Sequence, residues 1–482
     1  MSAEMPAETP AETPEIPANE AALRFQGSTS GTGPLTWGQT AIWDVLAWLG
    51  PDAVTLNRLA WWELAAGTDL DRVMRALPAL VERHDSLRSR YFQGPDGPLQ
   101  EVDATGELSL RIYAHEDGSP APSRENVGEQ LRQEPFDNAR DLPIRFGLVT
   151  RAGAPVALFA SISHMAVDGS SFPILSADLL DLLAGRELGP AGQQPLERAE
   201  YEASETGLAR ERRALAFWTD RLGDLPEPML MHAGRADQPD FLWARLDSPA
   251  MALAARSLAA RFGVEAGTPV LAGLALVLAG YTGETETALR LIVATRFLPA
   301  SRNLVGAFNL NALFRVGVRD EPISAFVQQT AGAQLSALRN CEIDPRKLDA
   351  LMAQTARSRG LDGSEGYCFV NDVRLERQRY GAADAVVASE LAAGIEAALP
   401  RTRISELSPG NAPKTANLFV HVHDTSEQAY LRLGGERRFL EPRGPAGFLH
   451  DLEQTLIRAA GNPDLPATEA FPKLSHTAMS DD

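Results

Sequence analysis

The sequence predicts a mixed α/β fold with two lobes, on two observations. Segments with the apolar spacing of helices alternate irregularly with segments that alternate like strands, without the regular strand–helix repeat of a doubly wound sheet. In addition, the segment Gly185 to Glu205 is rich in Gly, Pro, Gln and Glu, which is typical of a connector between two lobes. Hydrophobic residues make up 44% of the 482 residues, enough for a large core.

The first clear element is a helix over Leu70 to His84. Its apolar residues recur at helical spacing, and its acidic start and basic end suit the helix dipole. Pro78 can kink this helix. Leu108 to Tyr113 then alternates in the period of a strand.

A hairpin is predicted around Gly153, with strands over Ile144 to Thr150 and Val156 to Ser163. The second strand, VALFASIS, is nearly continuous in apolar and small residues, so we expect a central strand buried on both faces. A helix over Ile174 to Leu183 follows, and Gly185 is the residue type that commonly closes a helix.

The second half of the chain continues the irregular alternation of helices and strands. Helices are predicted over Gly207 to Leu222, Met251 to Phe262, Thr268 to Tyr281 and Pro445 to Ala460. Strands are predicted over Phe241 to Leu246, Thr287 to Ala294, Leu310 to Val318, Tyr367 to Val373, Asn417 to His423 and Tyr430 to Leu433.

Both ends of the chain have the composition of loose tails. The first 22 residues contain five Glu and four Pro but no Lys or Arg, so they lack the basic start and apolar run of a signal peptide. We expect a disordered acidic, Pro-rich tail over residues 1–32 and a flexible tail over residues 461–482. No apolar run is long enough to span a bilayer, and we expect no membrane insertion.

Charge and cysteine usage exclude several classes of protein. With 45 Lys plus Arg against 64 Asp plus Glu, the formal net charge is −19, which argues against a protein that binds nucleic acid through phosphates. Cys341 and Cys368 form no CxxC pair. This argues against a disulfide framework and a thiolate zinc site, and indicates a cytoplasmic protein.

One motif, the heptapeptide Ser163-His164-Met165-Ala166-Val167-Asp168-Gly169, stands between the buried strand and a helix. A histidine at the tip of a strand can place its imidazole in a channel between lobes, where its pKa suits proton transfer near neutral pH. Asp168 can turn back to pair with an arginine, and Gly169 permits a backbone angle that other residues resist. The alternative is a capped, partly buried loop histidine.

This HxxxDG pattern resembles the active-site motif of the acyltransferase superfamily that includes chloramphenicol acetyltransferase and the condensation domains of nonribosomal peptide synthetases. Further segments, in the same order along the chain, resemble condensation domains specifically. They are Leu35 to Trp43 (LTWGQTAIW), Arg83 to Tyr91 (RHDSLRSRY), Pro135 to Asp137 (PFD) with the LPIRFGL after it, Leu274 to Arg296, Val305 to Arg315 and Cys368 to Asp372.

The resemblance implies two chloramphenicol acetyltransferase-like lobes that form a V-shaped pseudodimer with a central tunnel. The lobes would span residues 33–186 and 207–460, with a linker over residues 187–206. A thioester on the phosphopantetheine arm of a carrier protein would enter one mouth and an amine or alcohol the other. His164 would accept the nucleophile's proton or orient it, and the Gly169 N–H would help to hold the thioester carbonyl. No bound cofactor or metal is implied.

Asp168 is expected to be structural, with Arg296 as the preferred partner and Arg83 or Arg88 as rivals. Ser163 stands where the family has the first His of HHxxxDG, a position expected to support packing. An ungapped match to the family's Val305 segment puts Leu310 at the family's Asn position. Arg83 and the two flanking residues, Asn309 and Asn311, are candidates for the tunnel wall.

The chain has no room for a fused adenylation or carrier domain, so the resemblance leads us to expect a stand-alone condensation enzyme that meets its carrier in trans. Arg83, Arg88 and Arg90 are candidates for a basic docking patch. Two alternatives stay open, an acyl-CoA-dependent acyltransferase of the same superfamily and a non-catalytic carrier-binding relative. His421 and His423 share one face of a predicted strand, and we expect them to be packing residues.

Overall fold

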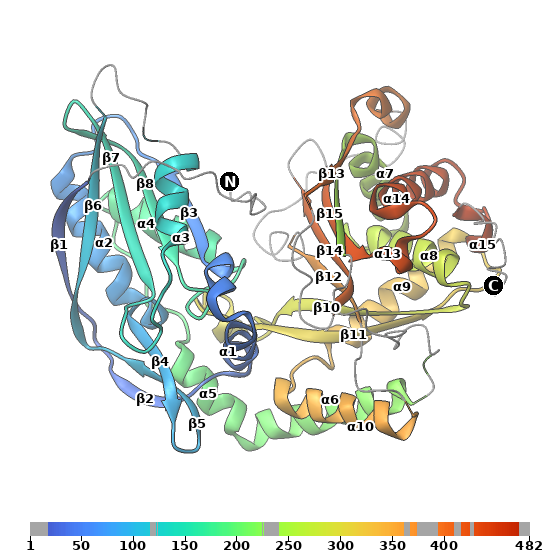
Figure 1. Cartoon of the computed structure of the whole chain (residues 1–482), viewed down its shortest axis with the longest axis horizontal. Coiled ribbons are helices and arrows are strands. Elements are labelled where there is room, and N and C mark those ends of the chain that lie inside the picture. Colours follow the sequence, from blue (N-terminus) through green and yellow to red (C-terminus); the bar gives the residue numbers. More distant parts are fainter. Residues whose placement is uncertain are drawn as a thin grey trace. The chain divides into compact units, whose positions relative to one another are not determined.

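The computed structural model describes residues 18–115, 122, 124–223, 225, 241–360, 367–373, 394–408, 416–424 and 429–471. These residues form two compact units (Figure 1). Unit 1 contains the residues up to Ala209 together with Ala294–Leu310, and unit 2 contains Arg210–Val293 and the residues from Asn311 onward. The segment Ala294–Leu310 therefore belongs to unit 1, although its place in the sequence puts it in the predicted second lobe.

Unit 1 is built on a five-stranded sheet in which only the β6–β7 pair is parallel. The α2 and α4 helices pack on one face, where Leu77 and Leu179 join Phe146 of the sheet in one buried cluster. In sheet order, the strands are β1 (Asn19–Gln26), β6 (Thr105–His115), β7 (Ile144–Arg151), β8 (Ala154–Ile162) and β3 (Arg58–Glu63), and the two helices are α2 (Leu70–Arg83) and α4 (Ser171–Leu183).

The opposite face of this sheet carries a smaller cluster, in which Tyr113, Val149 and Phe159 contact Leu131 of α3 (Glu129–Gln133). Consecutive residues of β7 thus enter opposite clusters, because side chains alternate between the two faces of a strand. The sheet of unit 1 is therefore covered on both faces.

The predicted hairpin of β7 and β8 is confirmed. Ala152 and Gly153 connect the two strands with φ angles of 49° and 79°, the left-handed region that glycine adopts without strain. β8 is hydrogen-bonded on both sides, to β7 and to β3, and its second half from Leu158 to Ile162 is buried. The near-continuous apolar run thus correctly predicts an interior strand.

A three-stranded sheet, β2 (Gly31–Pro34), β5 (Gly97–Val102) and β4 (Ser89–Gly94), forms the second sheet of unit 1. Next to this sheet, Tyr91 and Leu35 form a buried cluster with Met165 of the HxxxDG segment. The cluster packs against α1 (Trp37–Leu49). The helix begins with a capping box, in which the Thr36 hydroxyl and the Gln39 side chain each bond the other's backbone N–H.

Two expectations about loose segments are wrong in part, and the expected linker is partly helical. Residues 19–34 are not a disordered tail but contain β1 and β2, because Leu23 and Phe25 alternate with polar residues and are buried against the core. The expected linker over residues 187–206 contains α5 (Pro195–Ala203). The expected C-terminal tail contains α15 (Ala467–Ala470), where the Ala467 N–H donates to the Glu321 carbonyl. Residues 1–17 and 472–482 lie outside the described residues.

Unit 2 is built on a seven-stranded sheet (Figure 1). In sheet order, its strands are β11 (Asn309–Gly317), β10 (Glu286–Ala294), β12 (Tyr367–Asp372), β14 (Ala416–Asp424), β15 (Ala429–Glu436), β9 (Phe241–Ser248) and β13 (Arg403–Leu407). Its longer helices are α6 (Glu205–Leu222), which starts in unit 1, α7 (Pro249–Phe262), α8 (Gly267–Thr282), α9 (Ile323–Leu338), α10 (Pro345–Ser358) and α14 (Gly444–Gly461).

Each helix and strand predicted from the sequence is present, with ends shifted by at most three residues. The α8 helix is apolar on all sides and almost wholly buried, as expected for a helix inside a domain. No described helix by itself has the length and apolar composition to cross a bilayer. α7 and α8 meet that criterion only together, and they are bent by 110° relative to each other.

A close approach between α1 and the segment Ala307–Phe308 leads to the first prediction. A Cβ added to Gly38 would lie 2.4 Å from the Ala307 carbonyl oxygen and 2.6 Å from the Phe308 Cα. Because backbone atoms cannot rotate away, Gly38→Ala should lower the free energy of unfolding by about 1–3 kcal/mol. Urea denaturation of the full chain, followed by tryptophan fluorescence, measures this loss.

Gly332→Ala is the matched control for this substitution. Gly332 lies inside α9, and a Cβ there would have no neighbour within 4 Å. Alanine has a higher helix propensity than glycine, so this change should be stabilising by about 0.5–1 kcal/mol. Equal effects of the two substitutions would contradict the close contact at Gly38.

Candidate functional site

His164 lies in the turn that joins β8 to α4, as the sequence predicted. Its side chain is 5% exposed. The Nδ1 atom lies 2.6 Å from the Val167 carbonyl oxygen, and the Nε2 atom lies 3.1 Å from Nη2 of Arg58. A carbonyl can only accept and a guanidinium can only donate, so Nδ1 carries the hydrogen and Nε2 is the acceptor.

The pKa of His164 differs from the expectation of a value near neutral pH. Burial, and then the neighbouring Arg58 cation, lower it from 6.5 to about 4, while the Val167 carbonyl and Asp168 act in the opposite direction. The imidazole is therefore neutral at pH 7, and its Nε2 lone pair accepts the hydrogen bond from Arg58. It is a weaker base than an exposed histidine.

Arg58 is a neighbour of His164 that the sequence analysis did not find. It is the first residue of β3, and in the antiparallel β3–β8 ladder it stands opposite Ile162, two residues before His164. The residues of β3 show no motif, and β3 precedes β8 by about a hundred positions. Only knowledge of the strand pairing and its register could have identified this contact.

Asp168 pairs with Arg296, the preferred partner of the three arginines considered. Nη1 and Nη2 of Arg296 each donate to one carboxylate oxygen of Asp168 at 2.7 Å. The Asp168 carboxylate also accepts from the backbone N–H and hydroxyl of Ser171 and from the Phe308 N–H at 3.0 Å. Both charged side chains are at least 98% buried, so this is a fully hydrogen-bonded internal ion pair.

Arg296 also organises the segment Ala294–Leu310. Its Nε donates to the Leu304 carbonyl at 2.9 Å and its Nη2 to the Gly306 carbonyl at 3.2 Å. Ser171, the first residue of α4, completes the network by accepting from the Gly306 N–H. The turn that carries His164 is thus fixed to a distant part of the chain through charge-assisted bonds.

Two other residues of the motif, Ser163 and Gly169, differ in their contacts and burial. The Ser163 hydroxyl donates to Oδ1 of Asn138 at 2.9 Å and accepts from the Met165 N–H. Asn138 follows the PFD segment directly, and its carbonyl accepts from the Tyr91 N–H. Gly169 is half-buried, and its φ angle lies outside the left-handed region, so the expectation of an unusual backbone angle there is wrong.

The RHDSLRSRY segment is held inside unit 1. The Arg83 Nε and His84 Nε2 atoms both bond Asp178 of α4, at 2.7 and 2.9 Å. The Arg88 guanidinium is wholly buried and pairs with Asp85, while Arg90 pairs with Asp103. A docking patch that includes Arg88 is therefore wrong, because the side chain is not at the surface.

Asn309 and Asn311 are half-buried neighbours on β11. Asn309 follows Phe308, whose N–H donates to Asp168, and so it is close in sequence to the ion-pair network of unit 1. Asn311 belongs to unit 2. The structure does not bring these two side chains, or Arg83, into a described contact with His164, and their assignment to a tunnel wall stays a prediction.

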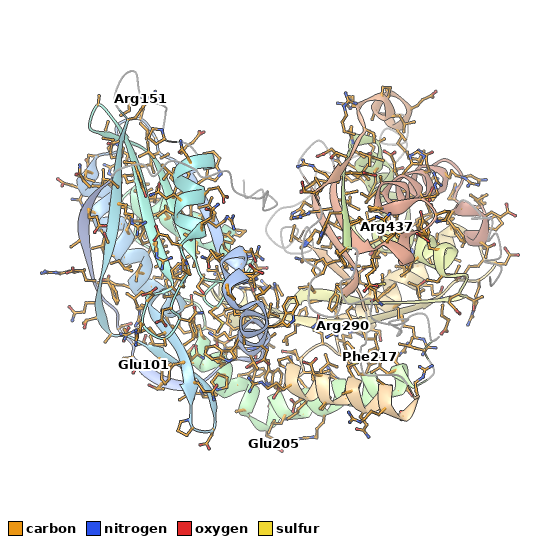
Figure 2. All side chains as sticks on the ribbon, in the orientation of Figure 1. Glu101, Arg151, Glu205, Phe217, Arg290 and Arg437 are labelled. Carbon is orange, nitrogen blue, oxygen red and sulfur yellow. The ribbon has the colours of Figure 1, made fainter. Side chains whose placement is uncertain are left out.

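Aromatic rings of unit 2 surround the two histidines of β14. His421 and His423 stack at 6.2 Å, and the row continues to Phe419 on one side and to Tyr430 on the other. Arg290, labelled in Figure 2, lies over the rings of Trp218 and Phe369 in the same unit. Among the described residues, no three His, Cys, Asp or Glu side chains are grouped so as to hold a metal ion.

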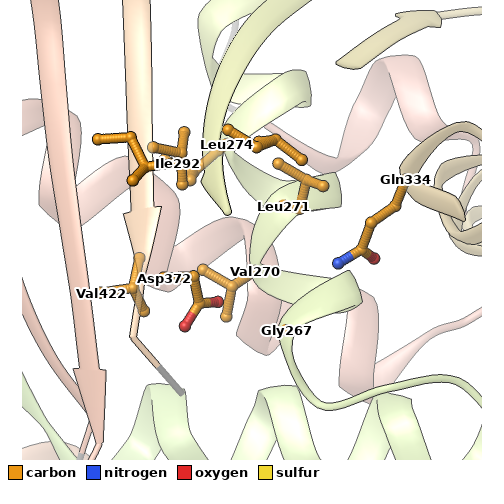
Figure 3. A pocket seen from close by; sticks show the side chains of 10 residues that line it. Gly267, Val270, Leu271, Leu274, Ile292, Gln334, Asp372 and Val422 are labelled. Atoms are coloured by element: carbon orange, nitrogen blue, oxygen red, sulfur yellow. The ribbon is translucent and has the colours of Figure 1, made fainter. Parts of the chain in front are cut away.

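A small cavity lies in unit 2 between α8, α9 and the sheet (Figure 3). It is lined mainly by apolar residues, including Val270, Leu274 and Ile292, with Gln334 and Asp372 as polar neighbours. Gln334 accepts a hydrogen bond from the buried Thr268 hydroxyl. Since the cavity contains none of the predicted site residues, the candidate site is the His164 turn in unit 1.

Comparison with known proteins places the chain among condensation domains. The family model of the condensation domain matches residues 30–361. The chain is 29% identical over 346 residues, 70% of its length, to the AMB antimetabolite synthetase AmbB of Pseudomonas aeruginosa, and 27% identical over 329 residues, 64% of its length, to the phosphinothricin tripeptide synthetase PhsC of Streptomyces viridochromogenes. It spans only 27% and 30% of these two relatives.

Solved structures share the fold. The condensation domain of the monacolin K polyketide synthase MokA superposes with a TM-score of 0.68 at 15% identity, over 91% of this chain and 100% of that one. The SgcC5 protein of Streptomyces globisporus superposes with a TM-score of 0.63 at 18% identity, over 90% of this chain and 100% of that one. The predicted α/β fold of condensation domains is therefore confirmed.

The buried ion pair leads to a prediction about stability. Arg296→Gln would leave the Asp168 carboxylate buried without its counter-charge and should lower the free energy of unfolding by about 3–5 kcal/mol. Asp168→Ala should lower the melting temperature and soluble yield for the same reason. Arg24→Gln, which breaks the exposed pair with Glu107, is the control and should change stability little. An Asp168→Ala variant as stable as the wild type would contradict this role.

The low pKa of His164 predicts a dependence of stability on pH. The folded state has a pKa of about 4 and the unfolded chain one near 6.5, so unfolding takes up a proton between these values. As the pH falls from 6.5 to 4, the wild type should lose about 3 kcal/mol that His164→Gln does not lose. Above pH 6.5 the difference between the two proteins should be constant. Urea denaturation across this pH range tests the change, and a constant difference throughout would refute it.

Proposed function

Because the chain belongs to the condensation-domain family, we propose that it joins a thioester-bound acyl or aminoacyl group to an amine or alcohol nucleophile in natural-product biosynthesis. Condensation domains of nonribosomal peptide synthetases are acyltransferases that form amide bonds. The donor would be carried on the phosphopantetheine arm of a carrier protein, which is a substrate and not a resident cofactor. The observation that supports this function is the fixed tautomer of His164, which presents Nε2 as an acceptor.

In the proposed reaction, the N–H or O–H of the attacking nucleophile replaces the Arg58 N–H as the donor to His164 Nε2. The nitrogen or oxygen of the nucleophile forms a bond to the thioester carbonyl carbon, and the carbon–sulfur bond breaks. The proton released by the nucleophile passes through Nε2 to the departing thiolate, which leaves as the pantetheine thiol. Since a neutral imidazole with a low pKa holds a proton only briefly, its main contribution is to orient the nucleophile and relay the proton.

The remaining residues of the motif would act through position. The Asp168–Arg296 pair holds the turn between β8 and α4, so it would set the place of His164 without touching the substrates. The Gly169 N–H would help to hold the carbonyl oxygen as negative charge develops on it. Ser163 would support the turn through its hydrogen bond to Asn138.

The carrier would be a separate protein that meets this chain in trans, in the cytoplasm, where the buried thiols of Cys341 and Cys368 stay reduced. An acyl-CoA could replace the carrier as donor with the same chemistry at His164. A non-catalytic relative would bind the carrier and form no product. One experiment separates these three cases.

The purified chain should be incubated with acylated carrier protein or the matching acyl-CoA, together with a panel of amines and alcohols, and products detected by mass spectrometry. We expect product from the carrier-bound donor and a rate about 10²- to 10⁴-fold lower for His164→Ala. His450→Ala removes an exposed histidine of α14 in unit 2 and is the control. Product from acyl-CoA alone would favour the CoA-dependent alternative, and carrier binding with no product would favour the non-catalytic one.

A further inference from the structure

We propose that the chain associates with a second copy of itself through β1, the edge strand of the sheet in unit 1. The two β1 strands run antiparallel about a two-fold axis at Ala22 and join the two five-stranded sheets into one. This inference goes beyond the proposed function and does not depend on the chemistry at His164. The hydrogen-bonding groups, the charges and the size of the side chains along this edge all support it.

β1 lies at one end of the unit 1 sheet (Figure 1). Among the described strands it pairs with β6 alone. Its eight residues match β6 in continuous register without a bulge, and none of them is proline. Soluble proteins commonly blunt such an edge with a bulge, a proline or a very short strand, because unpaired N–H and C=O groups attract another strand. β1 has none of these three devices, so its edge is suited to pair with a further strand.

The backbone groups of β1 that point away from β6 are those of the even-numbered residues. The Gly27 N–H donates to the Ala104 carbonyl on the β6 side at 2.8 Å, and the Gln26 N–H donates instead to Oε1 of Glu82 in α2, also at 2.8 Å. Since the N–H and C=O groups of successive residues in a strand point to opposite sides, the even positions face outward along the whole of β1. Glu82 thus closes this edge at Gln26.

The open part of the edge is symmetric about Ala22. In the part of the chain that the structure describes, no residue bonds the outward N–H and C=O groups of Glu20, Ala22 and Arg24. An antiparallel copy centred on Ala22 places Ala22 opposite itself and Glu20 opposite Arg24. Each of these facing pairs exchanges two N–H···O bonds. A second β1 strand therefore satisfies every open group of this stretch.

The charges along β1 match those of the second copy in this register. Within the sheet, Arg24 stands opposite Glu107 and its Nε donates to Oε2 at 2.9 Å, while Glu20 stands opposite Arg111. A row of side chains across the joined sheets then consists of Glu107 and Arg24 of one copy, followed by Glu20 and Arg111 of the partner copy. The signs alternate at every step, and the two-fold axis generates this row twice. Opposite charges on facing strands stabilise a sheet.

Other registers of the two strands are less favourable. A slide of two residues is the smallest that keeps the outward groups facing each other. It places Glu20 opposite Ala22 or Gln26 and leaves no Glu–Arg pair across the junction. A slide of four residues puts Glu20 opposite itself or Arg24 opposite itself, and like charges destabilise facing strands. The charges therefore select one register among those that backbone bonding allows.

Side-chain size and apolar contacts set the strength of this association. Ala22 is exposed and stands opposite Ser109 of β6, so only small side chains meet at the axis. On the other face of the sheet, Leu23 stands opposite Ala21 of the partner copy, but Leu23 is already buried in the core of unit 1. The junction therefore adds little apolar area. Interfaces below about 1,200 Å² are weak, so we expect a reversible dimer with a micromolar dissociation constant.

Complementary charge reversals test the register. Sedimentation velocity of the full chain over a hundredfold range of concentration should show a monomer that converts to a dimer. Glu20→Arg and Arg24→Glu each place like charges opposite one another, so each variant alone should raise the dissociation constant at least about 10-fold. An equimolar mixture of the two variants places opposite charges across a heterodimer, so the mixture should associate again.

Arg151→Glu is the control for these reversals, because Arg151, labelled in Figure 2, is exposed at the end of β7 and away from β1 in the sheet order. It should leave the dissociation constant unchanged. A wild type that stays monomeric at every concentration, as it would if another segment of the chain occupied the edge, would overturn the proposal. A mixture that associates no better than the single variants would overturn it as well.

A disulfide across the axis tests the position of the contact. Facing residues of a hydrogen-bonded pair have Cα atoms about 5.5 Å apart, which is within the range of a disulfide. Ala22→Cys should therefore form a covalent dimer under mild oxidation, visible on a non-reducing gel. The native thiols of Cys341 and Cys368 are buried and should not contribute.

Gln26→Cys is the control for the disulfide, because the two copies of residue 26 would lie about 27 Å apart in this register. It should give no covalent dimer. Failure of Ala22→Cys to cross-link, or equal cross-linking of both variants, would overturn the inference. The proposed function is tested separately by product formation, which a monomer can carry out, so either proposal can fail while the other stands.

Discussion

The buried pair of Asp168 and Arg296 is the interaction on which the site depends. Two charges inside a protein are costly unless each is fully hydrogen-bonded, and here the carboxylate accepts from the guanidinium, Ser171 and Phe308. The free-energy cost of burying the two charges is offset only when the chain brings all of these hydrogen-bond partners together. The pair thereby specifies how the segment Ala294–Leu310 runs past the turn at His164, although the two lie more than a hundred residues apart.

Burial also penalises charge at His164, but there the side chain is neutral and not ionised. Its ring is also buried, and burial together with the Arg58 cation favours the neutral form over the opposing effects of the Val167 carbonyl and Asp168. A neutral imidazole whose Nδ1 is bound to a carbonyl can only offer Nε2 as an acceptor. In the proposed reaction, this arrangement suits the orientation of a nucleophile better than the storage of a proton.

The sequence predicted the position of most elements, because apolar periodicity reports which side of a helix or strand is buried. It misjudged the segment before α1, where Leu23 and Phe25 form a strand despite the acidic, Pro-rich residues that precede them. That strand exists because β6 offers an edge for it to pair with, and an edge partner is not visible locally. The expectation of a docking arginine at residue 88 was wrong for a similar reason, since Asp85 and Thr29 hold it inside.

By itself, the sequence determined that His164 and Asp168 stand together at the end of a buried strand, because both lie within one short motif. It also narrowed the partner of Asp168 to three arginines, through the resemblance to condensation domains. The tertiary structure decided between them and placed Arg58 at Nε2 of His164. Local spacing fixes neighbours a few residues apart, but contacts between strands depend on pairing and register. These are set by the packing of the whole unit.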